Sequence, residues 1–118
     1  MKSWSYNSGD MPVIAGRVVF GAFGLDLTTG ELRKSGTVLK LEPQPAIVLC
    51  LLVSEAGKLV DRKTIRRRLW GESTFVDYDV GVDYCVNRIR SVLCDRARAP
   101  RYIETLRGRG YRFIAPVQ

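Results

Sequence analysis

The sequence has 118 residues, which suits one domain, and a net charge of +7 at pH 7, which is high for this length. A hydrophobic fraction of 46% allows one core and argues against wholesale disorder, and the longest apolar run, residues 46–53, is far too short to span a bilayer. The chain contains no histidine, which removes the commonest general base and the commonest zinc ligand and disfavours an enzyme.

The positive charge is concentrated in the second half of the chain. Residues 1–60 carry six Lys/Arg and five Asp/Glu, whereas residues 61–118 carry thirteen and seven. Twelve of those thirteen cations are arginines, whose planar fork suits phosphate and guanine edges. A clustered basic half indicates a polyanionic partner, although a solvated basic surface would give the same charge distribution.

The three cysteines are Cys50, Cys85 and Cys94. Their number is odd and their spacing fits no zinc pattern, so we expect neither a metal site nor a cofactor. Cys50 and Cys85 fall in apolar helical runs and are expected to be buried free thiols. This pattern indicates a reducing compartment, and therefore a cytoplasmic location.

The first part of the chain predicts a leader and then a small sheet. Residues 1–16 lack the basic start and apolar core of a signal peptide and are expected to form a flexible polar leader, with the domain spanning residues 17–118. Short apolar runs separated by glycine-containing turns predict an antiparallel sheet that needs helices packed on it. The expected strands are Val18–Phe20, Phe23–Leu27, Glu31–Lys34 and Thr37–Leu41.

Two helices are expected after the sheet. Prolines at both ends of residues 43–45 fit only an opening helical turn, and Gly57 is a plausible stop because glycine tolerates the left-handed cap. A short apolar step at residues 59–60 leads to Asp61, a good N-cap for a second helix that ends at Trp70–Gly71. The Arg66–Arg68 run is expected to form a solvated face, with one residue near a nucleic-acid backbone.

The third helix is expected from Val80 to Leu93. One face carries an apolar stripe at i, i+4, i+7 and i+11, formed by Val82, Val86, Ile89 and Leu93. The other positions offer groups that can contact nucleic acid: Tyr84, Asn87, Arg88, Arg90 and Ser91. Acids near the start, Asp77, Asp79 and Asp83, are explained by the helix dipole, so we expect no bound cation.

A hairpin is expected at the end of the chain. Tyr102–Leu106 and Tyr111–Ala115 have the pattern of two strands, joined by a tip at Arg107–Gly110. Glycines on both sides of Arg109 allow a tight tip and a close approach to a ligand. Tyr111 and Phe113 lie two apart on a strand, so they are expected to share the face that packs on the core.

The order sheet, three helices, basic hairpin is typical of a DNA-docking domain. A major groove admits one α-helix, where Asn pairs with adenine and Arg with guanine in bidentate fashion. An arginine-tipped hairpin can lie along the backbone or reach into the minor groove. These features predict an α+β fold that binds double-stranded DNA.

Four passages carry a resemblance to a known family over residues 17–116. They are FGLDLTTGELRKSGTVLKLEP, KLVDRKTIRRRLWG, VDYCVNRIRSVL and RYIETLRGRGYRF. In order and spacing the sequence resembles the OmpR/PhoB-type winged helix, the C-terminal transcriptional regulator domain of bacterial two-component systems. The resemblance implies a winged helix-turn-helix with a four-stranded N-terminal antiparallel sheet, three helices and a C-terminal β-hairpin wing.

The resemblance also implies which residues contact DNA. Family contacts fall on Asn87, Arg88 and Arg90 in the recognition helix, on Thr105 and Arg107 in the wing, and on Trp70 near phosphate. Together with the residues expected from the helix and hairpin patterns, the set is Trp70, Tyr84, Asn87, Arg88, Arg90, Ser91, Thr105, Arg107 and Arg109. Trp70 is expected to be partly buried, with its indole N–H facing phosphate.

The resemblance carries further expectations about partners and layout. The loop at residues 71–79 matches a segment that contacts RNA polymerase in some relatives, and the family binds direct repeats as a head-to-tail pair. Only sixteen residues precede the match. If Met1 is the native start, the layout resembles that of CadC/ToxR-type regulators, whose winged helix precedes a membrane segment; the alternative is a domain excised from a longer regulator. We expect no membrane contact by the present segment and a cytoplasmic location even if the regulator is membrane-anchored.

Two other functions remain open at the level of sequence. The run from Arg107 to Phe113 partly matches the basic-glycine-aromatic signature of the RRM, which would make the chain an RNA-binding module. Its third position is Arg109 where that signature has an aromatic residue, and only five residues follow Phe113. A protein–protein module on the same fold is the second alternative.

Overall fold

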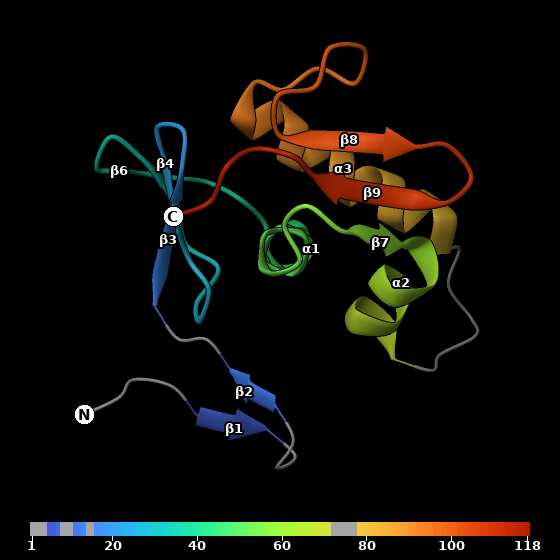
Figure 1. The fold of residues 1–118 in the computed structure, drawn as a ribbon, viewed down its shortest axis with the longest axis horizontal. Helices are drawn as coiled ribbons and strands as arrows, with labels where there is room; N and C mark the ends of the chain where they lie inside the picture. Colours follow the sequence, from blue (N-terminus) through green and yellow to red (C-terminus); the bar gives the residue numbers. More distant parts are fainter. Residues whose placement is uncertain (1–4, 8–10, 14–15, 72–77) are drawn as a thin grey trace.

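In a computed structural model, the described residues form three helices, a four-stranded sheet, a three-stranded sheet and a separate N-terminal hairpin (Figure 1). The structure describes residues 5–7, 11–13, 16–71 and 78–118, with side chains for residues 16–71 and 80–118. A four-stranded antiparallel sheet comes first, and three helices and a C-terminal hairpin follow it. The expected α+β winged helix-turn-helix is therefore confirmed.

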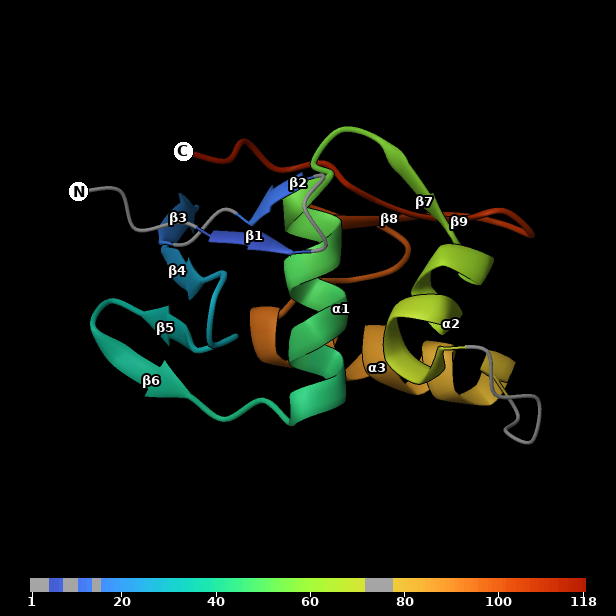
Figure 2. The ribbon, with the colours of Figure 1, turned by 90° about the horizontal axis from the view of Figure 1, so that it is seen from below.

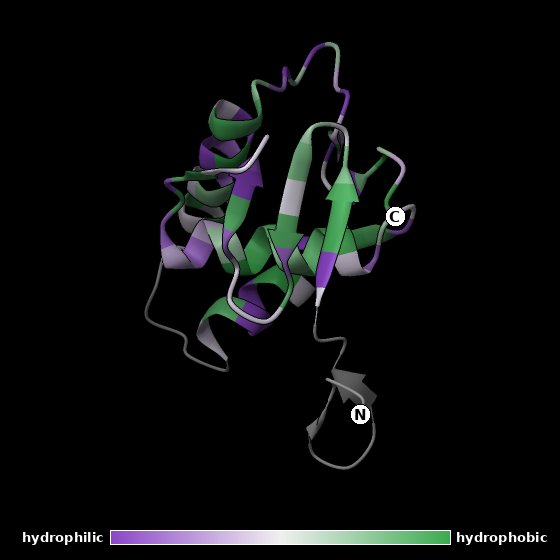
Figure 3. Ribbon diagram, turned by 90° about the vertical axis from the view of Figure 1, so that its left-hand side faces the viewer, coloured by the Kyte–Doolittle hydropathy of each residue, from purple (hydrophilic) through white to green (hydrophobic). Residues whose placement is uncertain are grey.

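The N-terminal sheet is a simple meander of antiparallel strands. Its strands are β3 (Arg17–Phe20), β4 (Phe23–Asp26), β5 (Leu32–Lys34) and β6 (Thr37–Leu39), paired in that order. All four expected strands are present, and β4, β5 and β6 are one or two residues shorter than predicted. In Figure 3, β3 is hydrophobic over most of its length, but only its last residue, Phe20, is buried in the core, while Val19 is exposed.

The leader contains a hairpin that the sequence did not predict. Strands β1 (Ser5–Asn7) and β2 (Met11–Val13) pair in antiparallel fashion. Each has only three residues, too few for an alternating pattern to stand out from a polar segment. The flexibility expected for residues 1–16 stays a prediction, and residues 1–4, 8–10 and 14–15 lie outside the described residues.

The first helix, α1 (Pro43–Ser54), lies between the N-terminal sheet and the other two helices (Figure 2). Pro43 opens it as expected. Most of its residues are buried, including Val48, Leu49 and Leu52, so α1 serves as the centre of the core. The helix ends at Ser54, three residues before the predicted stop at Gly57.

The helix-turn-helix pair is formed by α2 (Arg62–Trp70) and α3 (Tyr78–Leu93). Asp61 is the N-cap of α2, because its carboxylate accepts a 2.7 Å hydrogen bond from the backbone N–H of Thr64. The third helix begins two residues before the expected Val80. Its predicted apolar stripe is confirmed, since the four residues of the stripe are at most 3% exposed.

The C-terminal sheet has three strands in the order β7-β9-β8. The wing strands are β8 (Ile103–Leu106) and β9 (Gly110–Phe113), and β7 (Leu59–Asp61) pairs with β9. The sequence identified β7 only as an apolar step, because three residues are too few to show an alternating pattern. Gly110, with a φ of 154°, is required here, since a Cβ would collide with the carbonyl oxygen of Val60.

An aromatic cluster joins the two sheets at the bottom of the core. The ring of Phe20 on β3 lies 5.0 Å from Phe113 on β9, 5.8 Å from Tyr102 and 5.7 Å from Phe23, measured between centroids. Tyr111 and Phe113 are both buried, which confirms that they face the core. The cluster ties the wing to the N-terminal sheet through apolar contacts. Two backbone hydrogen bonds between Val19 of β3 and Gln118, which follows the wing, add a polar link.

The cysteines are all free thiols, but they differ in exposure. Cys85 is buried, as expected, and Cys94 is exposed. Cys50 is only half-buried, because its position on α1 borders the groove between that helix and the N-terminal sheet. Burial raises the pKa of both Cys50 and Cys85 to about 11, so neither thiol is reactive at neutral pH.

No helix in the described part of the chain, over residues 43–54, 62–70 and 78–93, is long and apolar enough to cross a membrane.

Candidate nucleic-acid interface

The outer face of α3 carries a polar stripe opposite the apolar one. Tyr84, Asn87, Arg88 and Ser91 occupy positions i, i+3, i+4 and i+7, which lie on one face of a helix. Tyr84 is 51% exposed, Asn87 and Ser91 are exposed, and Arg88 is half-buried. The structure thus brings four of the expected contact residues together on one accessible surface, which we call the α3 stripe.

Two members of the stripe share one carboxylate on α1. The hydroxyl of Tyr84 donates to Glu42 Oε2 at 2.6 Å, and Nε of Arg88 donates to Glu42 Oε1 at 3.0 Å. Hydrogen bonds from Tyr84 and then Arg88 lower the pKa of Glu42, while the bond to Glu42 raises the pKa of Tyr84. The Arg88 side chain is therefore held in place before any ligand binds.

Arg90 lies inside the domain, contrary to the expectation that it faces DNA. It is 8% exposed, and its NH2 nitrogen donates to the carbonyl oxygen of Ile103 at 2.9 Å and to Oγ1 of Thr105 at 2.7 Å. Its guanidinium lies 5.9 Å from the ring centroid of Tyr111. Position 90 falls on the side of α3 that packs against the wing, so this arginine fixes β8 to the helix.

The wing tip presents two arginines to solvent. The N–H of Arg109 donates to the carbonyl of Leu106 at 2.8 Å and closes a four-residue turn. Gly108, at the third position of that turn, has a φ of 74°, a conformation that favours glycine. Arg107 and Arg109 are both exposed, and neither forms an ion pair within the described residues.

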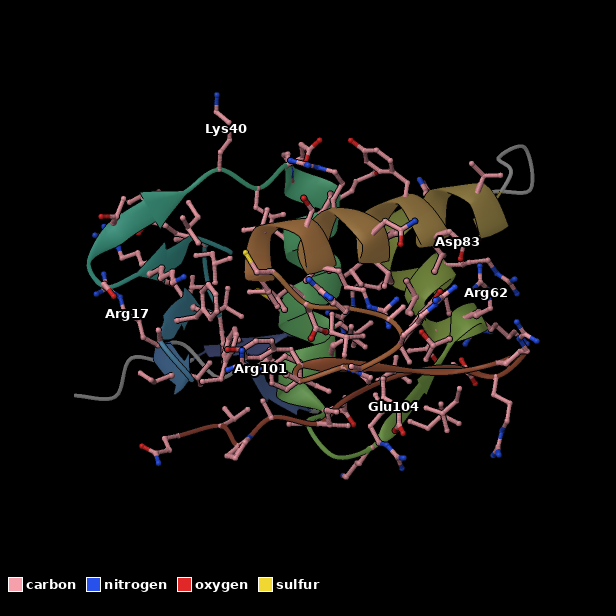
Figure 4. The ribbon with its side chains drawn as sticks, turned by 90° about the horizontal axis from the view of Figure 1, so that it is seen from above. Arg17, Lys40, Arg62, Asp83, Arg101 and Glu104 are labelled. Atoms are coloured by element: carbon pink, nitrogen blue, oxygen red, sulfur yellow. The ribbon has the colours of Figure 1, made fainter. Side chains whose placement is uncertain are left out.

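A polar network ties the start of α2 to α3 and to the wing. Asp83 accepts from NH2 of Arg62 at 2.9 Å and from the hydroxyl of Tyr111 at 3.1 Å, and NH1 of Arg62 lies 3.1 Å from that hydroxyl. Figure 4 shows Arg62 and Asp83 pointing toward one another where α2 meets α3. Burial raises the pKa of Tyr111. The network fixes the angle between recognition helix and wing, since hydrogen bonds are directional.

Of the three acids near the start of α3, the structure describes the side chain of Asp83. Asp83 is engaged by Arg62 and Tyr111, and no cluster of three or more His, Cys, Asp or Glu side chains that could hold a metal ion occurs within residues 16–71 and 80–118. Asp77 and the side chain of Asp79 lie outside the described residues.

Trp70 is half-buried at the end of α2, as expected. Its ring packs on the backbone of α3 at Gly81, where a Cβ would lie 2.5 Å from the ring. Gly81 therefore allows the close approach of the two helices. The direction expected for the indole N–H toward phosphate stays a prediction.

Three further residues belong to this surface, and the sequence did not single them out. Val80, 64% exposed, lies one helical turn before Tyr84 on the same face of α3. Arg62 and Lys63 line an open groove together with Gly108 and Arg109 of the wing tip. Helical spacing alone would have found Val80, whereas the two basic residues are brought to the tip by the β7–β9 pairing.

The loop expected to contact RNA polymerase spans residues 71–79. Gly71 and the helical backbone from residue 78 are described, while residues 72–77 lie outside the described residues. The polymerase contact therefore stays a prediction.

Known proteins are similar to this chain both in sequence and in fold. HilA of Salmonella typhi, a transcriptional regulator, is 34% identical over 107 residues, which are 91% of this chain and 19% of HilA. The chain thus spans about a fifth of the length of that relative. The response regulator DrrB of Thermotoga maritima, an OmpR/PhoB homologue, has a TM-score of 0.73 at 33% identity and is matched over 84% of this chain and 44% of DrrB.

A DNA-bound structure is also similar. The DNA-binding domain of RstA from Klebsiella pneumoniae, solved in complex with the RstA box, has a TM-score of 0.70 at 28% identity and covers 83% of this chain and 96% of that domain. The family described as transcriptional regulatory protein, C terminal, matches residues 36–113, from the last strand of the N-terminal sheet to the end of β9. The chain belongs to this family of OmpR/PhoB-type winged helix-turn-helix domains.

Proposed function

We propose that the domain binds double-stranded DNA at a specific sequence and thereby regulates transcription. The observation that carries this proposal is the α3 stripe, an exposed row of base-reading side chains beside an arginine-tipped wing. A helix of this kind fits a major groove, and the wing then meets the adjacent minor groove or backbone. The similarity to the RstA domain bound to its DNA box supports the same docking.

The residues of the α3 stripe, together with Val80, have chemistries suited to the groove. Asn87 can pair with adenine, and the terminal nitrogens of Arg88 can pair with guanine. Val80 can contact the methyl group of thymine, and Ser91 can donate to a phosphate oxygen. The hydroxyl of Tyr84 already donates to Glu42, so Tyr84 contributes its exposed ring to the surface. The stripe therefore combines base reading with backbone positioning.

The wing and α2 supply sequence-independent affinity. Arg107 and Arg109 at the tip, with Lys63 beside them, form a cationic edge for the backbone or the minor groove. Thr105 and Trp70 can contact phosphate at the borders of this surface. Arg90, which is buried, supports the surface from inside and takes no direct part in reading bases.

The domain acts as a regulator and not as an enzyme. It belongs to a family of transcriptional regulatory proteins, and its chain offers no histidine for acid–base or metal chemistry. We place it in the cytoplasm, bound to direct repeats as a head-to-tail pair, with the loop at residues 71–79 directed to RNA polymerase.

The RNA-binding alternative is disfavoured by burial. An RRM stacks bases on exposed aromatic rings of its central strand. The central strand here is β9, and its aromatic residues Tyr111 and Phe113 are 5% and 0% exposed. The sheet therefore offers no stacking platform.

The proposal is tested by selection from a random duplex DNA library at two salt concentrations. We expect enrichment of one sequence, with a log–log salt slope near roughly −5 if about six phosphates are contacted. Arg88→Ala should weaken the enriched site by about 1–3 kcal/mol and relax its specificity. Arg17→Ala, which removes the same charge from the N-terminal sheet, is the control and should leave the selected sequence unchanged. A parent domain that enriches no duplex would refute the proposed function.

A further inference from the structure

Glu42 occupies the N-cap position of α1 without capping the helix. Its side chain accepts no hydrogen bond from the first turn. An N-cap side chain normally accepts from the backbone N–H of the second or third helical residue. The third residue here is Pro45, which has no N–H, so one of the two usual donors is missing. The carboxylate is thereby available to another partner.

That partner is the α3 stripe. Glu42 reaches across from α1 and accepts from Tyr84 at 2.6 Å and from Nε of Arg88 at 3.0 Å. The side chains of Glu42 and Arg88 are 43% and 37% exposed, so the pair lies at the edge of the surface and not beneath it. A negative charge therefore sits within the surface that is to face a polyanion.

This geometry restricts how Arg88 can act. With Nε held by Glu42, the terminal nitrogens of the guanidinium remain for a ligand, and within the described residues no acceptor engages them. An acceptor pair on a base edge can use those nitrogens without displacing Glu42. A phosphate that approaches Arg88 instead meets a guanidinium whose charge is already paired with the carboxylate of Glu42, and that carboxylate repels the phosphate.

We propose that Glu42 is a specificity-determining residue of the DNA-binding surface. It fixes Arg88 and Tyr84 in one arrangement across α1 and α3, and its charge weakens contacts to arbitrary phosphates more than contacts to the correct bases. The inference rests on the proposed function, because it concerns how the same surface separates specific from non-specific DNA.

The test compares the full chain with Glu42→Gln, which removes the charge and keeps the shape and one acceptor oxygen. Glu31→Gln is the matched control, since Glu31 pairs with Arg33 on the N-terminal sheet at a similar exposure. Affinity is measured by fluorescence anisotropy for two duplexes, the sequence enriched by the parent and a random 24-base-pair pool, over a range of KCl concentrations.

Glu42→Gln should bind the random pool more tightly than the parent. The logarithm of its affinity should also fall more steeply with the logarithm of the salt concentration, by an amount that corresponds to about one more phosphate contact. The ratio of specific to random affinity should fall roughly fivefold or more, which corresponds to the lower bound for one bidentate base contact. Glu31→Gln should leave that ratio unchanged. A second variant, Glu42→Thr, places an uncharged residue that is common at N-caps at position 42. It should show the same fall in the ratio of specific to random affinity.

A purely structural role for Glu42 would give a different result. It would lower the thermal unfolding midpoint and weaken both duplexes alike, with the ratio preserved in Glu42→Gln and Glu42→Thr. That outcome, or an equal change in ratio for Glu31→Gln, would overturn the inference and leave the proposed function standing. A parent chain that enriches no sequence would overturn both.

Discussion

The two sheets of the domain are attached to the helices in different ways. The N-terminal sheet contacts the core through apolar residues, with Phe20, Phe23, Leu25 and Leu32 each at most 4% exposed. The ion pair described in this sheet joins Arg33 of β5 to Glu31, the residue just before β5, so it does not link the sheet to a helix. The wing sheet is also anchored by apolar residues, but polar bonds tie it to α3 through Arg90 and through the network of Asp83 with Arg62 and Tyr111.

The two kinds of attachment have different consequences: one stabilises the fold, and the other also sets the orientation of the wing relative to α3. The N-terminal sheet is held by apolar burial, which is non-directional, and by two backbone hydrogen bonds between Val19 of β3 and Gln118, at 2.8 and 2.9 Å, neither of which reaches α3. Hydrogen bonds require a defined geometry, so those around Arg90 and Asp83 set the angle between the recognition helix and the wing. Changes in the first region should therefore affect folding, whereas changes in the second should also affect binding to DNA.

The largest expected effect is that of Phe20→Ala. The ring is 1% exposed and meets three other aromatic rings, so its removal should leave a cavity and lower the free energy of unfolding by about 3–5 kcal/mol. Urea denaturation followed by tryptophan fluorescence measures this change. Val19→Ala is the control, because that neighbour is 49% exposed and should change stability little. If both variants lost the same free energy of unfolding, the aromatic cluster would not be what attaches the N-terminal sheet to the rest of the domain.

The next effect concerns the two arginines of α3 that point to opposite sides. Arg90→Met should lower the free energy of unfolding by about 1–3 kcal/mol, because it leaves the buried carbonyl of Ile103 without its donor. Since the wing loses its orientation, binding to every duplex should weaken as well. Urea denaturation and anisotropy on the same samples measure the two quantities.

Arg88→Met provides the matched control for Arg90→Met. Its side chain is 37% exposed and pairs with Glu42 on the surface, so stability should hardly change while the preference for the enriched sequence is lost. If Arg90→Met kept full stability and lost only sequence preference, Arg90 would be a base reader and its buried position would not describe the bound state.

The sequence predicts the elements that show a repeated apolar pattern or a local capping residue. It misses elements that form only because another strand lies beside them. The apolar stripe of α3, the N-cap at Asp61 and the wing strands follow from local patterns. By contrast, β7 is three residues long and is a strand only because β9 lies beside it. A short segment of this kind cannot be recognised without its partner.

The same limit applies to the candidate site. Helical spacing identifies the exposed residues of α3, and it also places Arg90, four residues after Val86 and three before Leu93, beside the apolar stripe. It does not show which groups pack against each arginine. The partner of Arg88 is Glu42, 46 residues earlier in the chain, and the partners of Arg90 are on β8. Contacts between residues so far apart are set by the tertiary fold.

A smaller effect is expected at the junction of the wing sheet and α2. Asp61 ends β7 and caps α2, so Asp61→Ala should lower the free energy of unfolding by about 1 kcal/mol, whereas Asp61→Asn keeps an acceptor and should cost less. Hydrogen bonds from Thr64 hold the pKa of Asp61 below its usual value. The stabilisation is therefore complete above the unfolded-state pKa and is lost as the pH falls through the lower folded-state value. The difference between parent and Asp61→Ala should accordingly shrink at acid pH in urea denaturation, and a difference independent of pH would contradict the cap.

The smallest effect is expected from the surface ion pairs that both sheets carry. Arg33 lies 3.0 Å from Glu31 on the N-terminal sheet, and Nε of Arg112 lies 2.8 Å from Glu104 between the wing strands, all with side chains 36–39% exposed. Glu104 lies on the far side of the wing from α3 (Figure 4). Glu31→Gln and Glu104→Gln should each change the free energy of unfolding by less than about 1 kcal/mol, and the change should disappear at high salt because exposed charges are screened. Since neither pair links a sheet to α3, neither variant should alter the ratio of specific to random DNA affinity. A loss of that ratio in Glu104→Gln alone would mean that the wing is oriented by its own strands as well as by Arg90 and Asp83.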